Sequence, residues 1–315
     1  MENKKLNCLI IGGGGFVGSW LAKNLIDKGH SVTILDPDFN YFHLESTKFN
    51  LVKEFRIKYL LKNVTTYKGR FQDIGHELVS KNNFQIIANL AAHAVEKPLD
   101  SKVSFNQISN DIELIYSIIS TLKDSKANCK LVFMSSSAVY GNYDYATTEY
   151  APLNPTSTYG ISKAAGEFLI RANLKNWNII RSNATYGYGD LGDRATHILV
   201  EKAFNKEKAW VNDTVWSDFI YVKDLVEGIA QVMLKAPQSE IFHISGGKPY
   251  KLLSYVEEIN HYLPFDYEIK SIQDRPKRGV LDNSKANMLL GWSPKYDLES
   301  GVKDYMNYVK KYKNA

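Results

Sequence analysis

Four consecutive glycines near the start of the chain constrain its fold more than any other feature. They occupy positions 12–15, after the apolar run 6–11, and Gly18 follows within a segment of helical apolar spacing. A strand that turns this sharply into a helix lets backbone amides approach a pyrophosphate at the helix N-terminus, which predicts a dinucleotide site. Two spacings fit, G-x-G-x-x-G from Gly13 and G-x-x-G-x-x-G from Gly12, so the role of each glycine stays open. The cofactor contacts predicted in this loop are Gly12, Gly15, Phe16, Val17 and Gly18.

Asp36 indicates which dinucleotide this site takes. Gly29 ends the helical segment, residues 31–35 are interpreted as a second strand, and Asp36 follows that strand. About 20 residues beyond the glycines, a carboxylate accepts hydrogen bonds from the adenosine ribose hydroxyls and repels a 2′-phosphate. The predicted cofactor is therefore NAD and not NADP.

Composition argues against several other classes of protein. The 315 residues can bury a large core, and the net charge of +5 comes from Lys and Arg spread along the chain, so no nucleic-acid partner is expected. Cys8 and Cys129 lie in apolar stretches and are interpreted as core residues of a protein in a reducing compartment. The seven His lack the spacing of zinc sites, so no metal is expected. No segment approaches the roughly 18 apolar residues of a membrane span, and we expect a cytoplasmic protein with no membrane partner.

Strand-like and helix-like segments alternate along much of the chain. The strand-like runs are 7–11, 31–35, 64–68, 86–90, 130–135 and 178–181. This alternation predicts the α/β class, with a doubly wound, Rossmann-like parallel sheet and helices on both faces. We expect a dinucleotide-binding domain over 1–182, to which 216–245 returns, and a smaller C-terminal substrate-binding lobe over 183–315, interleaved with it. Ligands on such a sheet collect at the carboxyl ends of its strands.

Two later motifs carry residue types that acid–base chemistry needs. Residues 135–137 are three serines at a predicted strand end, and Tyr159 precedes Lys163 by four positions, which places both on one helix face. A free phenol has a pKa near 10, so a tyrosine that acts as a base near neutrality needs its pKa lowered by about 3. A neighbouring ammonium supplies part of that lowering. A serine hydroxyl could bridge Tyr159 and a substrate oxygen, whereas isolated serines at strand ends commonly satisfy backbone groups only.

A longer ordered set of motifs accompanies these residues. It comprises Gly12-x-x-Gly15-x-x-Gly18, Asp36, Asp73-Ile74, Leu90-Ala91-Ala92, Ser135 through Gly141, Pro155-x-x-x-Tyr159-x-x-x-Lys163, Asp218 through Asp224, and Arg275-Pro276 through Pro294. Over nearly its full length the chain thus resembles the extended short-chain dehydrogenase/reductases of the nucleotide-sugar epimerase/dehydratase kind. The resemblance implies that Tyr159 is the base, that Lys163 binds the nicotinamide ribose and lowers the pKa of the phenol, and that Ser136 orients the reacting oxygen.

The resemblance implies further contacts with cofactor and substrate. Asp73 would hold the adenine amino group and Ile74 would pack on the adenine ring. The other implied cofactor contacts are Leu90, Ala91, Ala92, Ser135, Tyr159 and Lys163. The predicted contacts with a nucleotide-sugar substrate are Ser136, Ser137, Asn183, Trp216 and Arg275.

The residues at positions 137 and 138 distinguish which reaction a member of the family catalyses. Its dehydratases carry an acidic pair there and its decarboxylases carry Glu at the second position, whereas this chain has Ser137 and Ala138. What remains is oxidation at C4 of a nucleotide-activated hexose or heptose, by a 4-epimerase or 4-dehydrogenase of surface-polysaccharide sugar biosynthesis. One alternative is an NAD(P)H-dependent nucleotide 4-keto-sugar reductase. An alternative of another class is a non-catalytic dinucleotide-sensing regulator.

The chain departs from the family at two substrate positions. The Arg that often contacts the diphosphate is Ser217 here, although Arg275 could still pair with a diphosphate. The Asn that the family usually carries would stand one position after Asn183, where this chain has Ala184. Trp210 and Trp216 stack on a base or fill the lobe interface, and the second is the commoner role for a Trp. Family members commonly dimerise through two helices, here about 108–122 and 159–174, which implies a homodimer or homotetramer.

Overall fold

The central strands form a parallel sheet, and their side chains are buried on both faces of it. The computed structural model describes residues 5–37, 52–92, 102–125, 128–143, 146–191, 194–272 and 278–313. The strands of its main sheet are β1 (Asn7–Ile11), β2 (Ser31–Asp36), β3 (Thr65–Lys68), β4 (Ile86–Asn89), β5 (Lys130–Met134), β6 (Trp177–Arg181) and β11 (Glu240–His243). They lie in the order β11-β6-β5-β4-β1-β2-β3, and every neighbouring pair is parallel. The order reverses at β1, so a crevice at the carboxyl ends of β1 and β4 is the expected ligand position.

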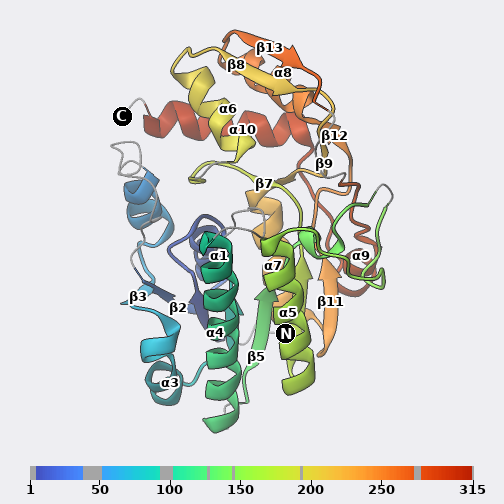
Figure 1. Ribbon diagram of the computed structural model, residues 1–315. Coiled ribbons are helices and arrows are strands. Elements are labelled where there is room, and N and C mark those ends of the chain that lie inside the picture. The colour runs from blue at the N-terminus through green and yellow to red at the C-terminus, as the bar shows by residue number, and fades with distance from the viewer. Residues whose placement is uncertain are drawn as a thin grey trace.

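Helices cover both faces of this sheet (Figure 1). They are α1 (Phe16–Asp27), α3 (Phe71–Lys81), α4 (Lys102–Asp124), α5 (Thr158–Asn173) and α7 (Val222–Lys235), with the short turns η1 (Arg56–Leu60) and η2 (Ser137–Tyr140). Successive side chains of β1 point to opposite faces of the sheet. Cys8 and Ile10 pack in one core cluster with α1 and α7, whereas Leu9 and Ile11 pack in another with α3 and α4. The predicted doubly wound α/β sheet is therefore confirmed.

The two cysteines belong to this core, as predicted. Both are free thiols, and burial raises the pKa of Cys8 and of Cys129 to about 12. Among the helices of the described residues, none is long and apolar enough to cross a membrane.

A smaller lobe lies beyond the carboxyl ends of the main strands (Figure 1). Its elements are β7 (Thr185–Tyr186), α6 (Ala195–Phe204), β8 (Ala209–Asn212), β9 (Trp216–Ser217), β10 (Ile220–Tyr221), β12 (Tyr250–Lys251), α8 (Leu252–Tyr262), β13 (Tyr267–Lys270) and α10 (Leu298–Lys313). The helix α9 (Ser284–Leu290) instead packs beside β11 of the main sheet and beside α7 (Figure 1). The strands of the lobe form three two-stranded sheets, β10-β7, β12-β9 and β13-β8. Between these pieces the chain returns through α7 to β11, which pairs with β6. The two parts are therefore interleaved along the chain, because α7 and β11 belong to the main sheet and its helices. The residue limits of the two domains stay a prediction.

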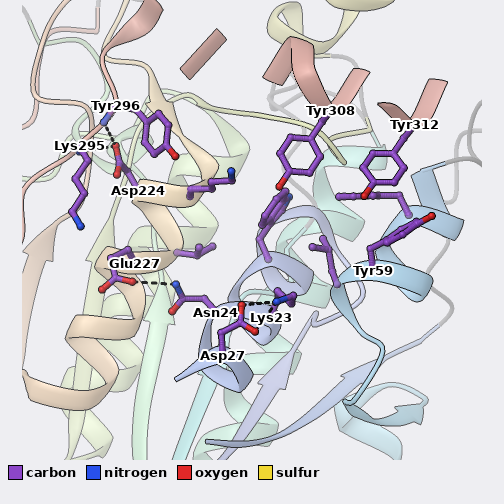
Figure 2. Close-up of a pocket in the computed structure, with 15 residues that line it drawn as sticks. Lys23, Asn24, Asp27, Tyr59, Asp224, Glu227, Lys295, Tyr296, Tyr308 and Tyr312 are labelled. Atoms are coloured by element: carbon purple, nitrogen blue, oxygen red, sulfur yellow. Dashed lines mark hydrogen bonds and ion pairs between the residues drawn. The ribbon is translucent and has the colours of Figure 1, made fainter. Parts of the chain in front are cut away.

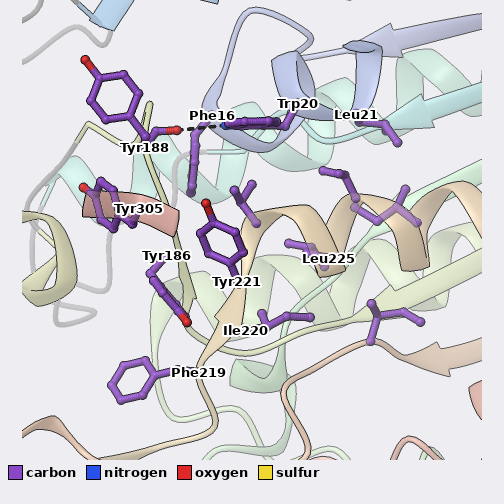
Figure 3. Close-up of a cluster of buried hydrophobic side chains, with 14 of the residues drawn as sticks. Phe16, Trp20, Leu21, Tyr186, Tyr188, Phe219, Ile220, Tyr221, Leu225 and Tyr305 are labelled. Carbon is purple, nitrogen blue, oxygen red and sulfur yellow. Dashed lines mark hydrogen bonds between the residues drawn. The ribbon is translucent and has the colours of Figure 1, made fainter. Parts of the chain in front are cut away.

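Aromatic side chains join α1 to this lobe (Figure 3). The indole Nε1–H of Trp20 donates to the backbone oxygen of Tyr188 at 2.9 Å. Close by, the rings of Tyr186 and Tyr221 lie 5.3 Å apart and are almost fully buried. Burial of several large rings stabilises the position of the lobe over the sheet.

Candidate active site

Gly12 and Gly13 serve different purposes in the glycine loop. Gly12 has φ +78°, a conformation that side chains rarely adopt, and a Cβ there would lie 2.7 Å from the amide nitrogen of Ala91. Gly13 has no such backbone requirement, but a Cβ on it would collide with the side chain of Ile34 on β2. Gly12 therefore makes the turn, and Gly13 allows the loop to pack on the sheet.

The start of α1 fits an anion. Its N-cap is Gly15, no side chain caps the helix, and the first turn holds no acidic residue. Gly18 packs so closely on the backbone oxygen of Gly12 that a Cβ could not be accommodated. The first amides of α1, including those of Phe16 and Val17, therefore suit a pyrophosphate, which needs close approach and the positive end of the helix dipole.

The carboxyl ends of β2 and β3 place the predicted adenosine contacts together. Asp36 Oδ2 accepts a hydrogen bond of 3.0 Å from the amide of Gly14, and the amide of Gly69 donates to the Asp36 backbone oxygen at 3.1 Å. Ile74 lies over Gly69, since a Cβ there would be 3.0 Å from Ile74 Cδ1. Asp73 is exposed on the first turn of α3. An adenosine contact for these three predicted residues is therefore spatially consistent.

Asn89 shapes the turn after β4, and sequence reasoning missed it. Its side chain is 1% exposed, and its Oδ1 accepts a hydrogen bond of 3.2 Å from the amide of Ala91. The amide of Leu90 donates to the backbone oxygen of Ile11 at 2.9 Å. Leu90, Ala91 and the following Ala92 thus lie beside the glycine loop, where their cofactor contacts were predicted. The sequence signal that could have identified Asn89 was its position, as a polar residue at the end of an apolar strand.

The three serines after β5 have three different partners. Ser135 donates a 2.5 Å hydrogen bond to Glu167, and Ser137 donates to Asn183 Oδ1 at 3.3 Å. Ser136 caps η2, because its Oγ accepts a hydrogen bond of 3.1 Å from the amide of Ala138. As an acceptor in that bond, the Ser136 hydroxyl keeps its proton for donation to a substrate oxygen.

Helix α5 rests on η2 and thereby brings the two chemical motifs together. Ser157 caps α5 by accepting from the amide of Gly160 at 3.2 Å. Gly160 lies so near Ala138 that a Cβ would be 2.5 Å from its carbonyl oxygen. The next turn carries Lys163, whose Nζ lies 5.7 Å from the centroid of the Tyr159 ring. The predicted Ser, Tyr and Lys therefore lie at the carboxyl end of β5.

Lys163 is anchored deep in this site. Its Nζ donates a 2.7 Å hydrogen bond to the backbone oxygen of Met134, and its side chain is almost fully buried. Burial lowers the pKa of Lys163 to about 8, although the carboxylates of Asp111 and Glu167 oppose this shift. Asp111 also accepts a hydrogen bond of 2.8 Å from Ser162. The ammonium is thus held at a fixed position, with a proton affinity below that of an ordinary lysine.

A buried polar network behind Ser135 was not predicted. Arg181, on β6, donates from Nε to Glu167 Oε1 at 2.9 Å and from Nη2 to Oε2 at 2.5 Å. Its Nη1 donates to the hydroxyl of Tyr140, which in turn lies 2.7 Å from His243 Nε2. Because His243 Nδ1 faces the Asp282 backbone oxygen, Nε2 is the acceptor, and burial lowers the pKa of His243 to about 3. The only signal in the sequence was a charged residue at the end of an apolar strand.

The predicted substrate residues are less closely assembled. Asn183 donates from Nδ2 to the hydroxyl of Tyr143 at 3.1 Å. Trp216 is 49% exposed with Lys251 Nζ 5.5 Å from its ring centroid, and Trp210 is 46% exposed. Lys270 Nζ lies 5.6 Å from the ring centroid of Trp210, so both tryptophans are half-exposed beneath a lysine, and the substrate contact expected of Trp216 stays a prediction. Arg275 lies outside the described residues.

Comparisons with known proteins agree with this arrangement. The model of the "NAD dependent epimerase/dehydratase family" matches residues 8–245. A provisionally named UDP-glucose 4-epimerase of Methanocaldococcus jannaschii is 30% identical and covers 96% of this chain and 98% of its own. The dTDP-4-dehydro-6-deoxyglucose reductase of Escherichia coli is 27% identical over 96% of this chain and 97% of its own. The structure of UDP-glucuronic acid 4-epimerase from Bacillus cereus, in complex with UDP-glucuronic acid and NAD, is 24% identical, has a TM-score of 0.85, and covers 97% and 99% of the two chains.

Proposed function

Because the chain belongs to the NAD-dependent epimerase/dehydratase family, we propose that it is a nucleotide-sugar 4-epimerase that works through oxidation at C4. The observation that carries this proposal is the position of Lys163, buried and bonded to Met134, with its Nζ near the ring of Tyr159. This pair stands beside Ser136 at the carboxyl end of β5, next to a glycine loop suited to a dinucleotide pyrophosphate.

In this proposal the chain supplies binding, orientation and proton transfer. Tyr159 removes the proton from the C4 hydroxyl, while Ser136 holds the same oxygen by a hydrogen bond. Lys163 places positive charge near the phenol, which favours the phenolate form. Bound NAD would supply the acceptor for the hydride of C4 and the donor that returns it. Epimerisation follows when the 4-keto sugar turns its other face to the site before Tyr159 returns the proton.

The residues after Ser136 support simple hydride exchange over elimination. An elimination needs an acid and a base next to the reacting carbons. Ser137 and Ala138 occupy those positions, both are almost fully buried, and the Ser137 hydroxyl is engaged with Asn183. Neither residue can replace a carboxylic acid near neutral pH.

A 4-keto-sugar reductase is the second candidate. The likeness to the Escherichia coli reductase favours it, since that relative matches nearly the whole chain. Asp36 argues against a reductase that uses NADPH, because a carboxylate at the end of the second strand would repel a 2′-phosphate. A 4-dehydrogenase would share the first half of the epimerase reaction and release the ketone.

One experiment separates these candidates. The purified chain is incubated with UDP-, GDP-, CDP- and dTDP-sugars, and the absorbance of NADH and the structure of the product are recorded. We expect a 4-epimer without net NADH, and we expect Tyr159→Phe to abolish it while NAD still binds. A ketone formed with stoichiometric NADH would identify a dehydrogenase. Rapid reduction of added 4-keto sugars by NADPH alone would overturn the proposal.

A further inference from the structure

Arg56 connects the glycine loop to the smaller lobe. It lies on η1, a π-helical turn, and its side chain is 2% exposed. Its Nη1 donates a hydrogen bond of 3.0 Å to the backbone oxygen of Gly14, and its Nε donates one of 3.0 Å to that of Gly189. One guanidinium therefore holds two backbone segments that are far apart in the sequence.

Gly14 is consequently held on both sides. Its amide donates to Asp36, and its carbonyl accepts from Arg56. The orientation of this residue sets the direction of the backbone that follows, and the next amides open α1, where the pyrophosphate is expected. A loop whose donors already point at the ligand binds it without the cost of ordering them.

Gly189 belongs to the segment of the smaller lobe that follows β7. It has φ +97°, which suits glycine, and the preceding Tyr188 carbonyl accepts from Trp20 (Figure 3). Two side chains of the cofactor-binding part, Arg56 and Trp20, thus fix successive carbonyls of this segment. A change in the glycine loop can therefore reach the lobe through Arg56.

Aromatic packing keeps Arg56 in place. The preceding Phe55 ring lies 4.7 Å from the ring of Tyr188 and 5.0 Å from that of Tyr312 on α10. Tyr59, on the same turn, also packs on Tyr312 at 4.7 Å, and Figure 2 shows Tyr59 and Tyr312 on the same side of a pocket. π-Helical turns are rare and occur frequently at functional sites. The turn therefore presents Arg56 to the loop from a rigid support.

We infer that Arg56 is a positioning residue for the cofactor pyrophosphate, and that it couples the glycine loop to residues 186–191. Its planar guanidinium can bond both carbonyls at once, whereas a lysine ammonium on a flexible stem cannot reproduce this geometry. The inference goes beyond the proposed function, because it concerns the dinucleotide and holds whichever sugar is the substrate.

Binding measurements on the NAD-free full chain test this inference without any sugar. The variants are Arg56→Met, which keeps the apolar stem, and Arg56→Lys. The matched control is Lys58→Met, because Lys58 lies on the same turn, is exposed and pairs with Glu54. Isothermal titration compares ADP-ribose, which carries the pyrophosphate, with adenosine, which lacks it.

We expect Arg56→Met to weaken ADP-ribose by about tenfold or more and adenosine by less than about twofold. Arg56→Lys should give a smaller loss for ADP-ribose, and the control should match wild type. Equal losses for both ligands would indicate general structural damage and overturn the inference, as would an unchanged affinity for ADP-ribose. If Arg56→Met does not fold, Arg56→Lys decides by the same comparison.

Amide hydrogen exchange tests the coupling to the smaller lobe. ADP-ribose should slow exchange at residues 12–18 and 186–191 in the wild type. In the Arg56 variant that folds, saturating ADP-ribose should protect the loop but no longer protect residues 186–191. Protection of 186–191 that persists in the variant would contradict the coupling.

Discussion

A Cβ atom on Gly160 would lie 2.5 Å from the carbonyl oxygen of Ala138, so the first turn of α5 rests directly on η2. This contact sets the distance between Tyr159 and Ser136, because Tyr159 adjoins Gly160 and Ser136 accepts a hydrogen bond from the amide of Ala138. Gly160→Ala should push the two elements apart and reduce kcat by about tenfold to a hundredfold, since small misplacements of reacting groups are costly. NAD affinity should change little. The control is Gly228→Ala on α7, whose Cβ would be equally crowded, at 2.4 Å from Ile244 Cγ2, but lies outside the contact between α5 and η2. Equal kcat for the two variants would contradict this prediction.

The buried ion pair of Glu167 and Arg181 predicts a strongly non-additive pair of variants. Both side chains are almost fully buried. Arg181→Met should lower the free energy of unfolding by about 3–5 kcal/mol, because it leaves a buried carboxylate without its cation. Adding Glu167→Met should recover part of that loss, since the uncompensated charge is then removed. Urea unfolding of the single and double variants measures the coupling, and additive losses would show that the pair is not the cause.

Local patterns predicted those parts of the fold that depend on residues near in sequence. The apolar runs indicated the strands of the main sheet, and the spacing of Gly12, Gly15 and Gly18 indicated the turn into α1. Tyr159 and Lys163 were found by the same means, because one helical turn separates them. Each of these features can be seen in a short window of sequence.

Contacts between distant segments escaped the same reasoning. The bond from Arg56 to Gly189 spans 133 positions, and nothing near either residue indicates the other. Arg181 was included in a buried strand without a partner, because its ion pair depends on how α5 crosses β6. The sequence left two roles open for Trp210 and Trp216, and their half-exposure depends on the small sheets of the lobe, which no short window of sequence shows.

Asp36 should control the choice between NAD and NADP. Asp36→Asn removes the charge that repels a 2′-phosphate and keeps an oxygen that can accept from Gly14. We expect the ratio of the NADP Kd to the NAD Kd to fall by about tenfold, which corresponds to about 1.4 kcal/mol. Asp27→Asn is the control, because Asp27 pairs with Lys23 at the far end of α1. An unchanged ratio in Asp36→Asn would remove Asp36 from cofactor discrimination.

Association of two chains is predicted to use α4 and α5, which lie side by side (Figure 1). Tyr116 on α4 is 67% exposed and Phe168 on α5 is 57% exposed, which is unusual for large apolar side chains on neighbouring helices. Phe168→Glu should place a charge in the interface and shift the chain toward a monomer in light scattering. Met288→Glu on α9 is the control, since Met288 is also exposed but lies elsewhere. A wild-type chain that is already monomeric would refute the predicted dimer or tetramer.

Lys163 should make stability depend on pH in the alkaline range. Burial lowers its pKa to about 8 in the folded protein, whereas an unfolded lysine has a pKa near 10.4. Between these values the unfolded chain holds the extra proton, so the free energy of unfolding rises with pH. Below pH 8 both states are protonated and the folded state carries the full cost of the buried charge, about 3 kcal/mol at most. Lys163→Met lacks this cost, so the stability of the wild type relative to the variant should increase between pH 8 and 10.4. Urea unfolding of both proteins at pH 7.5 and pH 10 measures the change, and parallel pH dependences would show that the Lys163 pKa is not lowered.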